Sequence, residues 1–138
     1  LDKFERVIGI DWDKFAIAAA RRNASETERY IAADVELELA SASKNDGFPA
    51  VEFGAERLGS RPSLTLIADP PATGLSAGVR KAIIDLGPAT LIYVSCNPPT
   101  LARDLRELEH KFTIDSVTPL DMFPQTAEIE VVAHLRAT

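Results

Sequence analysis

The sequence predicts an α/β fold with a mostly parallel sheet that ends in an antiparallel hairpin. Four short apolar segments each precede a stretch with helical spacing, which indicates parallel βαβ units with right-handed crossovers. The last two segments alternate apolar and polar residues, as expected of a terminal hairpin. With 138 residues, 46% of them hydrophobic, the chain is expected to form a single domain over residues 1–138.

The first half of the chain is expected to hold two strand–helix units. Val7–Ile10 is short and apolar, and Asp13–Asn23 follows with several alanines, which are good helix formers. The second unit is a weaker strand over Arg29–Ala32 and a helix over Val35–Ala42. Residues 43–62 contain several glycines and prolines, so we expect a loop there, with room for one helical turn.

The second half repeats this pattern and then changes to two consecutive strands. The expected elements are strand Leu64–Ala68, helix Ser76–Leu86, strand Ala89–Val94, helix Pro99–His110 and strands Phe112–Pro119 and Glu128–Leu135. The third of these is apolar throughout, which suits a strand buried on both faces. The helix after it opens with a proline in its first turn and carries leucines at helical spacing.

Cys96 is the only cysteine, so it cannot form a disulfide within the chain. No further ligands at metal-site spacing accompany it, and we therefore expect no metal centre. A lone cysteine is most often buried and inert. Cys96, however, falls between the carboxyl end of an apolar strand and the start of a helix, where open α/β sheets bind ligands and a thiolate is stabilised. We therefore interpret it as a candidate nucleophile.

Aspartates follow three predicted strands: Asp11, Asp34 and Asp69. The carboxyl ends of parallel strands meet at one edge of a sheet, where nucleotide-like cofactors bind and acids accept hydrogen bonds from ribose hydroxyls. All three are candidates for binding such a cofactor, although Asp34 has an equal claim to be a helix N-cap. Trp12 and Phe15 either contact the adenine of the cofactor or pack the first helix, and packing is the favoured interpretation.

Pro70 and Pro71 stiffen the segment after Asp69, because each proline fixes its own φ and lacks an N–H donor. A rigid segment at this edge suits the clamping of a planar base or the positioning of a nucleophile, and a structural turn is the alternative. Gly74 then gives the chain the freedom to turn into the next helix.

The chain carries 15 basic and 21 acidic residues, a formal net charge of −6. Strong RNA binding needs clustered Lys and Arg, so we do not expect this chain to hold RNA tightly by itself. It has no leader-like segment and no apolar run long enough to span a membrane, which favours a cytoplasmic protein without a membrane partner.

Three segments carry a resemblance to a known family. They read Asp69-Pro-Pro-Ala-Thr-Gly-Leu, Tyr93-Val-Ser-Cys-Asn-Pro-Pro-Thr-Leu-Ala-Arg-Asp-Leu and Asp121-Met-Phe-Pro-Gln-Thr-Ala-Glu-Ile-Glu130. They are similar to the catalytic domain of the RNA uracil-5-methyltransferase family, which makes 5-methyluridine in tRNA or rRNA with S-adenosylmethionine (SAM). The resemblance covers essentially the whole chain. It implies a Rossmann-like class I methyltransferase fold, SAM as the cofactor and RNA as the substrate.

The resemblance also implies roles for individual residues. Cys96 corresponds to the family's nucleophile and Glu130 to its general base; without the motif, Glu130 would be interpreted as an exposed hairpin residue. Asp11 and Asp69 correspond to residues that contact the methyl donor. We expect the substrate to be positioned by three residues of the same motifs, Pro70, Pro71 and Asn97.

The chain also departs from the family pattern. Ala72 stands where relatives usually have Arg, and Glu128 where they usually have His. The first strand and the glycine-rich turn of the class I fold are apparently lacking, because no Gly-x-Gly run precedes Asp11. We therefore expect a partial catalytic domain, with the RNA gripped mainly by segments absent from this chain.

Three alternative functions remain open. An amino-group methyltransferase of nucleic acids also uses an Asp-Pro-Pro segment, but it needs an aromatic residue where Ala72 stands. A catalytically impaired remnant or binding fragment would keep the fold without the activity. A cysteine hydrolase would need His110 or His134 as its base, but His110 closes a helix and His134 lies in a terminal strand, so this alternative is disfavoured.

Overall fold

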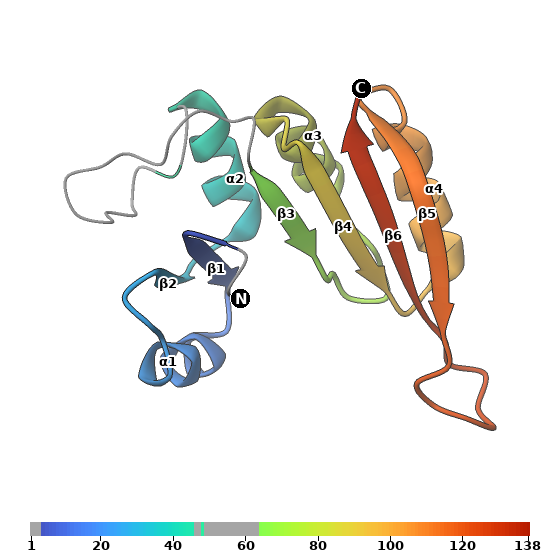
Figure 1. Cartoon of the computed structure of the whole chain (residues 1–138), viewed down its shortest axis with the longest axis horizontal. Helices are drawn as coiled ribbons and strands as arrows, with labels where there is room; N and C mark the ends of the chain where they lie inside the picture. The colour runs from blue at the N-terminus through green and yellow to red at the C-terminus, as the bar shows by residue number, and fades with distance from the viewer. Residues whose placement is uncertain (1–3, 46–47, 49–63) are drawn as a thin grey trace. The chain divides into compact units, whose positions relative to one another are not determined.

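The structure is a computed structural model that describes residues 4–45, 48 and 64–138. The chain divides into two compact units, Leu1–Gly59 and Ser60–Thr138, which are described separately below. Figure 1 labels the elements of both units. The first unit holds β1 (Val7–Asp11), α1 (Lys14–Arg22), β2 (Glu28–Ala32) and α2 (Val35–Lys44).

The first unit is built on a parallel pair of strands. β1 and β2 pair from Val7 opposite Glu28 to Asp11 opposite Ala32, with α1 as the crossover between them. The helix begins after Asp13, whose carboxylate accepts hydrogen bonds from the N–H groups of the first turn. The predicted strand–helix–strand unit is thereby confirmed.

Helix α2 is longer than predicted. It continues to Lys44, so the predicted loop is wrong at positions 43 and 44. The reason is local: the Ser43 hydroxyl donates to the Ala40 carbonyl oxygen at 2.9 Å, and Asn45 Nδ2 donates to the Ser41 carbonyl oxygen at 2.8 Å, so polar side chains satisfy the last turn. Positions 46–47 and 49–62 of that predicted loop lie outside the described residues.

The second unit is a four-stranded mixed sheet with two helices. Its elements are β3 (Thr65–Ala68), α3 (Ala77–Leu86), β4 (Thr90–Ser95), α4 (Pro98–Leu108), β5 (Phe112–Leu120) and β6 (Glu130–Ala137). The strand order is β3-β4-β6-β5, in which β3 and β4 are parallel and the pairs β4–β6 and β5–β6 are antiparallel. The predicted parallel unit and terminal hairpin are both confirmed. β6 starts two residues later than predicted. The Glu128 N–H donates to the Thr126 hydroxyl within the turn and therefore does not pair with a neighbouring strand.

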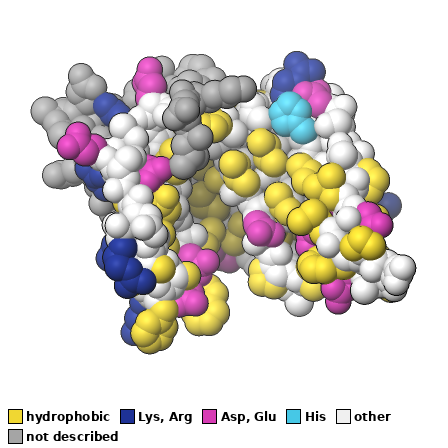
Figure 2. All heavy atoms as spheres, turned by 60° about the horizontal axis from the view of Figure 1, so that its bottom comes forward, with side chains coloured by type: hydrophobic (Ala, Val, Ile, Leu, Met, Phe, Trp, Pro, Cys, Tyr) yellow, Lys and Arg dark blue, Asp and Glu magenta, His cyan; other side chains and the backbone are white. Residues whose placement is uncertain are grey.

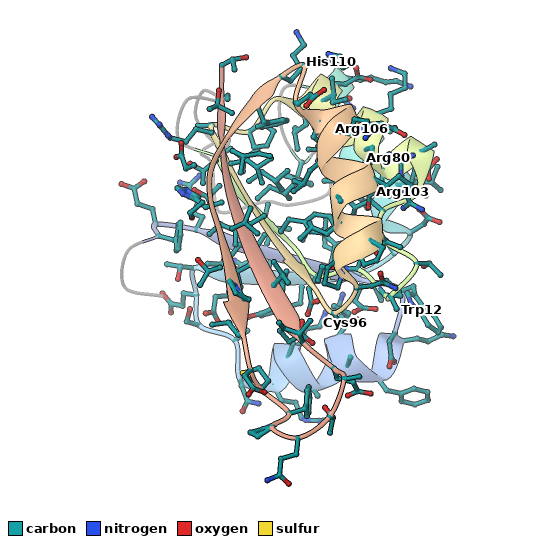
Figure 3. All side chains as sticks on the ribbon, turned by 90° about the vertical axis from the view of Figure 1, so that its right-hand side faces the viewer. Trp12, Arg80, Cys96, Arg103, Arg106 and His110 are labelled. Atoms are coloured by element: carbon teal, nitrogen blue, oxygen red, sulfur yellow. The ribbon has the colours of Figure 1, made fainter. Side chains whose placement is uncertain are left out.

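One face of this sheet forms the core. Along β4 and β6 every second residue is buried, and the buried positions lie opposite one another. Helices α3 and α4 cover this face, as Figures 1 and 3 show, and α4 adds a row of buried leucines. The paired core positions are Leu91 with Leu135, Tyr93 with Ala133 and Ser95 with Val131.

Residues on the other face of the same sheet are less buried within this unit. Ile92 and Val94 are only half-buried, so the expectation of a strand buried on both faces is wrong; the two helices of this unit cover one face. Ile67 is 60% exposed and Val117 is 50% exposed. Figure 2 shows hydrophobic side chains gathered over this part of the surface.

The expected sheet is present as two separate pieces. Within the described ranges, β1 pairs with β2 alone and β3 with β4 alone. The α/β class, with parallel strands joined through helices and an antiparallel C-terminal hairpin, agrees with the sequence prediction. None of the helices in the described ranges has the length and apolar character needed to cross a membrane.

Candidate active site

Cys96 lies in the short turn between β4 and α4. Ser95 is the last residue of the strand and Asn97 is the N-cap of the helix. Figure 3 shows Cys96 at this lower end of α4. Its side chain is exposed, so the prediction of a presented thiol is confirmed and the expectation of a buried cysteine is wrong.

Hydrogen bonds hold the turn on both sides of the cysteine. The buried Ser95 hydroxyl accepts from the Asn97 N–H at 3.1 Å and donates to the Asn97 carbonyl oxygen at 3.2 Å. The Asn97 side chain accepts from the Thr100 N–H at 3.3 Å, and two prolines occupy the first helical positions, where no N–H partner is needed. Asn97, predicted to position the substrate, thus caps α4.

Glu130 stands at the same end of the neighbouring strand. It is the first residue of β6 and is half-buried. The last pair of the antiparallel β4–β6 ladder is Ser95 opposite Val131. Because Cys96 follows Ser95 and Glu130 precedes Val131, each lies one residue past that pair. The structure therefore places the predicted nucleophile and the predicted base at the same end of two neighbouring strands.

Asp69 lies at this edge as well. It directly follows β3, whose last residue, Ala68, pairs with Tyr93 of the parallel strand β4. Its side chain is exposed. After the two prolines the chain makes a tight turn, in which the Gly74 N–H donates to the Pro71 carbonyl oxygen at 2.8 Å and Gly74 has a φ of +76°. The carboxyl ends of β3 and β4 thus present Asp69 and Cys96 together.

The candidate residues of the first unit make local contacts. The exposed Asp11 carboxylate accepts from the Asp13 N–H at 2.8 Å, just before α1. Asp34 is the N-cap of α2 and accepts from the Leu37 N–H at 3.1 Å, so its structural alternative is observed. Trp12 is 81% exposed and Phe15 is 84% exposed, so the interpretation that they pack α1 is wrong.

A buried carboxylate near the site escaped the sequence analysis. Asp104 in α4 is completely buried and accepts from the Leu75 N–H at 2.8 Å and the Tyr93 hydroxyl at 2.7 Å. It also pairs with Arg80 of α3 at 2.9 Å and with Arg103 at 2.7 Å. Figure 3 shows the two arginines beside α4. One signal was present in the sequence: position 104 falls on the leucine-bearing face of the helix, where a charge requires partners.

Electrostatics fixes the protonation of this network. Burial alone would raise the pKa of Asp104, but hydrogen bonds from Tyr93, the Leu75 N–H and Arg103 outweigh it and hold that pKa below its ordinary value. Burial, together with the bond to Asp104, raises the pKa of the Tyr93 phenol. At neutral pH Asp104 is therefore an ionised acceptor and Tyr93 a protonated donor, which suits structural support rather than proton transfer.

Neither histidine lies at the cysteine. His110 follows the C-terminal end of α4 and Cys96 precedes its N-terminal end, as Figure 3 shows. A helix of 11 residues is about 16 Å long, beyond hydrogen-bond reach. His134 lies opposite Ile92 in the middle of β6, with its Nδ1 atom 3.6 Å from Asp115. The cysteine-hydrolase alternative therefore lacks the histidine base that it requires. In the described parts of the chain, no three acidic, histidine or cysteine side chains group as metal ligands.

Solved structures first define the class of protein. The chain matches Pyrococcus abyssi tRNA (uracil-54, C5)-methyltransferase, solved in complex with S-adenosyl-L-homocysteine, with a TM-score of 0.70 and 32% identity over 97% of this chain and 29% of that one. It also matches the N-methyltransferase NodS of Bradyrhizobium japonicum with a TM-score of 0.59 and 17% identity, over 96% of this chain and 66% of that one. The second likeness supports the fold alone, which is that of the methyltransferases.

Sequence relationships then define the family. The model of the tRNA (uracil-5-)-methyltransferase family matches residues 2–138. The tRNA (uracil(54)-C(5))-methyltransferase of Pyrococcus horikoshii is 37% identical over 134 residues, which cover 94% of this chain and 27% of that protein. The chain belongs to the tRNA (uracil-5-)-methyltransferase family, and it spans roughly a quarter of the length of this relative.

Proposed function

We propose that the protein containing this chain methylates carbon 5 of uracil in RNA, with Cys96 as the nucleophile and Glu130 as the general base. The observation that carries the proposal is the exposed thiol at the end of β4, one residue past the ladder pair that Glu130 adjoins on β6. Membership of the family, and a relative whose name specifies uracil 54 of tRNA, support this substrate.

The chemistry explains why a thiol and a carboxylate are needed together. Carbon 5 of uracil is a weak nucleophile, so the Cys96 thiolate first adds to carbon 6 and pushes the ring electrons toward carbon 5. After carbon 5 has gained its methyl group, Glu130 takes the proton from that carbon. The released electron pair re-forms the double bond between carbons 5 and 6, and the sulfur–carbon bond breaks, which regenerates the thiolate.

The residues present fit SAM as the methyl donor. Its ribose hydroxyls and amino group are hydrogen-bond donors, and an exposed carboxylate such as that of Asp69, at the end of β3, is an acceptor that matches them. We propose contacts from Asp69 and, in the first unit, from Asp11 and Asp34. When bound, SAM would supply an electrophilic methyl group. Pro70 and Pro71 keep the backbone after Asp69 rigid.

The RNA requires more than this chain offers. A net charge of −6 disfavours tight phosphate binding, so we propose that other segments of the protein grip the RNA. A uracil inside folded RNA must also be extruded before a thiolate can reach carbon 6. We also propose a cytoplasmic location for the reaction, which is compatible with tRNA or rRNA as the substrate.

Release of tritium from RNA that carries [5-³H]uracil tests the proposal, because the reaction displaces the hydrogen on carbon 5. The longest available protein containing this sequence is incubated with the RNA and SAM. We expect Cys96→Ser and Glu130→Gln each to lower release by at least about 1,000-fold, since each removes an essential group. Glu109→Gln, at the far end of α4, is the matched control and should keep full release.

The products separate the remaining alternatives. Methyl transfer without tritium release would identify an amino-group methyltransferase, because that reaction leaves carbon 5 untouched. A folded protein that transfers no methyl group to any RNA would favour a catalytically impaired remnant. Either outcome would contradict the proposal.

A further inference from the structure

The loop after β3 and the turn at Cys96 are linked by a single hydroxyl. Thr100 Oγ1 lies 3.1 Å from the Ala72 carbonyl oxygen and 2.9 Å from the Asn97 carbonyl oxygen, so its proton is shared between the two acceptors. Ala72 directly follows the two prolines, and Asn97 directly follows the cysteine. The hydroxyl therefore joins the two segments that carry the proposed chemistry.

A second set of contacts fixes the other end of the loop. Arg103 Nη2 donates to the Thr73 carbonyl oxygen at 3.0 Å, and Asp104 accepts from the Leu75 N–H at 2.8 Å. Between them Gly74 packs so closely that a Cβ atom there would lie 2.5 Å from Asp104 Oδ2. The loop is thus anchored at a buried carboxylate and then reaches toward the active-site edge, where Thr100 holds it.

The two residues that hold the loop, Asp104 and Thr100, differ in burial, and we therefore expect them to differ in their effect on stability. Asp104 is inaccessible to solvent, so its loss disturbs the fold. Thr100 is half-buried and Ala72 is exposed, so water can replace the hydroxyl at the Ala72 carbonyl oxygen with little effect on stability. A shift of the loop, in contrast, would act directly on the reaction, because a misplacement of about 1 Å between reacting groups can slow a reaction about 100-fold.

We propose that Thr100 is a positioning residue whose hydroxyl sets the place of the Asp69-Pro70-Pro71 segment relative to Cys96. In this way it aligns the side of the site that holds the methyl donor with the base bound to the thiol. The inference rests on the proposed function, and it assigns no contact between Thr100 and the substrate.

The test compares Thr100→Val with Thr100→Ser. Valine keeps the shape of the side chain and removes the hydroxyl, whereas serine keeps the hydroxyl. We expect Val to slow single-turnover tritium release about 10- to 100-fold with an unchanged KM for RNA, and Ser to restore most of the rate. Alkylation of Cys96 by iodoacetamide should be equally fast in both variants. Thr118→Val, on the exposed strand β5, is the matched control.

Two results would overturn the inference: a Val variant as fast as the wild type, or a Ser variant as slow as Val. If the wild type releases no tritium, the proposed function fails. The role of the Thr100 hydroxyl in holding the loop is then tested separately, by amide hydrogen exchange in this chain. The Gly74 N–H, bonded to the Pro71 carbonyl oxygen, should exchange about 10-fold faster in the Val variant than in the wild type or the Ser variant. Equal exchange in all three proteins would contradict the positioning role.

Discussion

In the second unit, some residues are exposed where they can take part in the proposed reaction, and others are buried and hold the site in position. Cys96 and Asp69 are exposed at the sheet edge, as acting groups must be. Asp104 is sealed, and donors from a loop, a strand and two helices converge on its two oxygens. A carboxylate that is saturated in this way has no capacity left for a substrate, and removing it takes a counter-charge from the buried Arg80, which keeps only its pairing with the half-exposed Glu107.

The first prediction concerns the stability that Asp104 provides. Asp104→Asn is expected to lower the free energy of unfolding by about 3–5 kcal/mol, because Arg80 and Arg103 lose a buried counter-charge. Glu107→Gln is the control, since the Glu107 side chain is half exposed and its pairing with Arg80 is expected to contribute less than about 1 kcal/mol. Urea titrations measure both. Equal losses for the two variants would contradict the assignment of Asp104 as the anchor.

The same carboxylate predicts a pH dependence. Its pKa in the folded protein lies below the ordinary value of 3.8, so its contribution to stability is fully present above that value. The contribution is lost as the pH falls below 3.8 and through the folded-state pKa. Unfolding free energies at several pH values should therefore show the gap between wild type and Asp104→Asn constant near neutral pH and narrowing in acid. A gap that widens in acid would contradict this account.

A further prediction concerns the effect of a substitution at Ala72 on RNA binding. The residue is exposed, and its backbone oxygen already bonds to Thr100, so a longer side chain can extend into solvent. Ala72→Arg should tighten RNA binding and steepen its salt dependence by about one counterion. Filter binding at several salt concentrations measures this, with Ala102→Arg on the exposed side of α4 as the control. An equal gain in both variants would indicate a general effect of charge.

At the scale of elements, the segment between β3 and α3 is held by the helix that follows the cysteine. The turn at Gly74 requires a positive φ, and the same residue packs against the side chains of Arg103 and Asp104. Gly87, the C-cap of α3, also has a positive φ, but its nearest neighbouring atom is the Ile84 carbonyl oxygen at 4.0 Å from a built Cβ. The two glycines therefore share a backbone requirement and differ in crowding.

This difference gives a matched pair of substitutions. Gly87→Ala should cost only the left-handed backbone penalty, about 1 kcal/mol. Gly74→Ala should cost about 2–4 kcal/mol, because a contact of 2.5 Å forces the buried carboxylate to move. Thermal unfolding of the two variants measures the costs. Equal costs would show that α4 does not hold the loop closely.

At the scale of the whole molecule, local order could be read from the sequence and long-range pairing could not. The starts of α1 and α4 were predictable because Asp13 and the prolines after Asn97 are capping signals. The strand order β3-β4-β6-β5 was not, because strand pairing depends on contacts between residues far apart in the chain. The one-sided burial of β4 was missed for the same reason: an apolar run does not reveal how many layers cover it.

The candidate site also has features that could be predicted from the sequence and features that could not. The exposure of Cys96 agrees with expectation, because the strand–turn–helix pattern places it at the end of a strand. Glu130 was singled out by the resemblance to the family, since the hairpin pattern by itself indicates only an exposed residue. The support from Asp104 and Thr100 was not foreseen, because a polar residue on a helix is normally taken to face solvent and its partners come from segments about 25–30 positions away.

The central claim is that Cys96 bonds covalently to carbon 6 of uracil. Intact-mass spectrometry of the longest available protein containing this sequence, incubated with 5-fluorouracil RNA and SAM, tests it most directly, because fluorine on carbon 5 blocks the final elimination and traps the adduct. We expect one RNA-linked species that maps to Cys96 and is absent from Cys96→Ser. Release of methylated normal RNA without any trapped adduct, or an adduct at another residue, would contradict it.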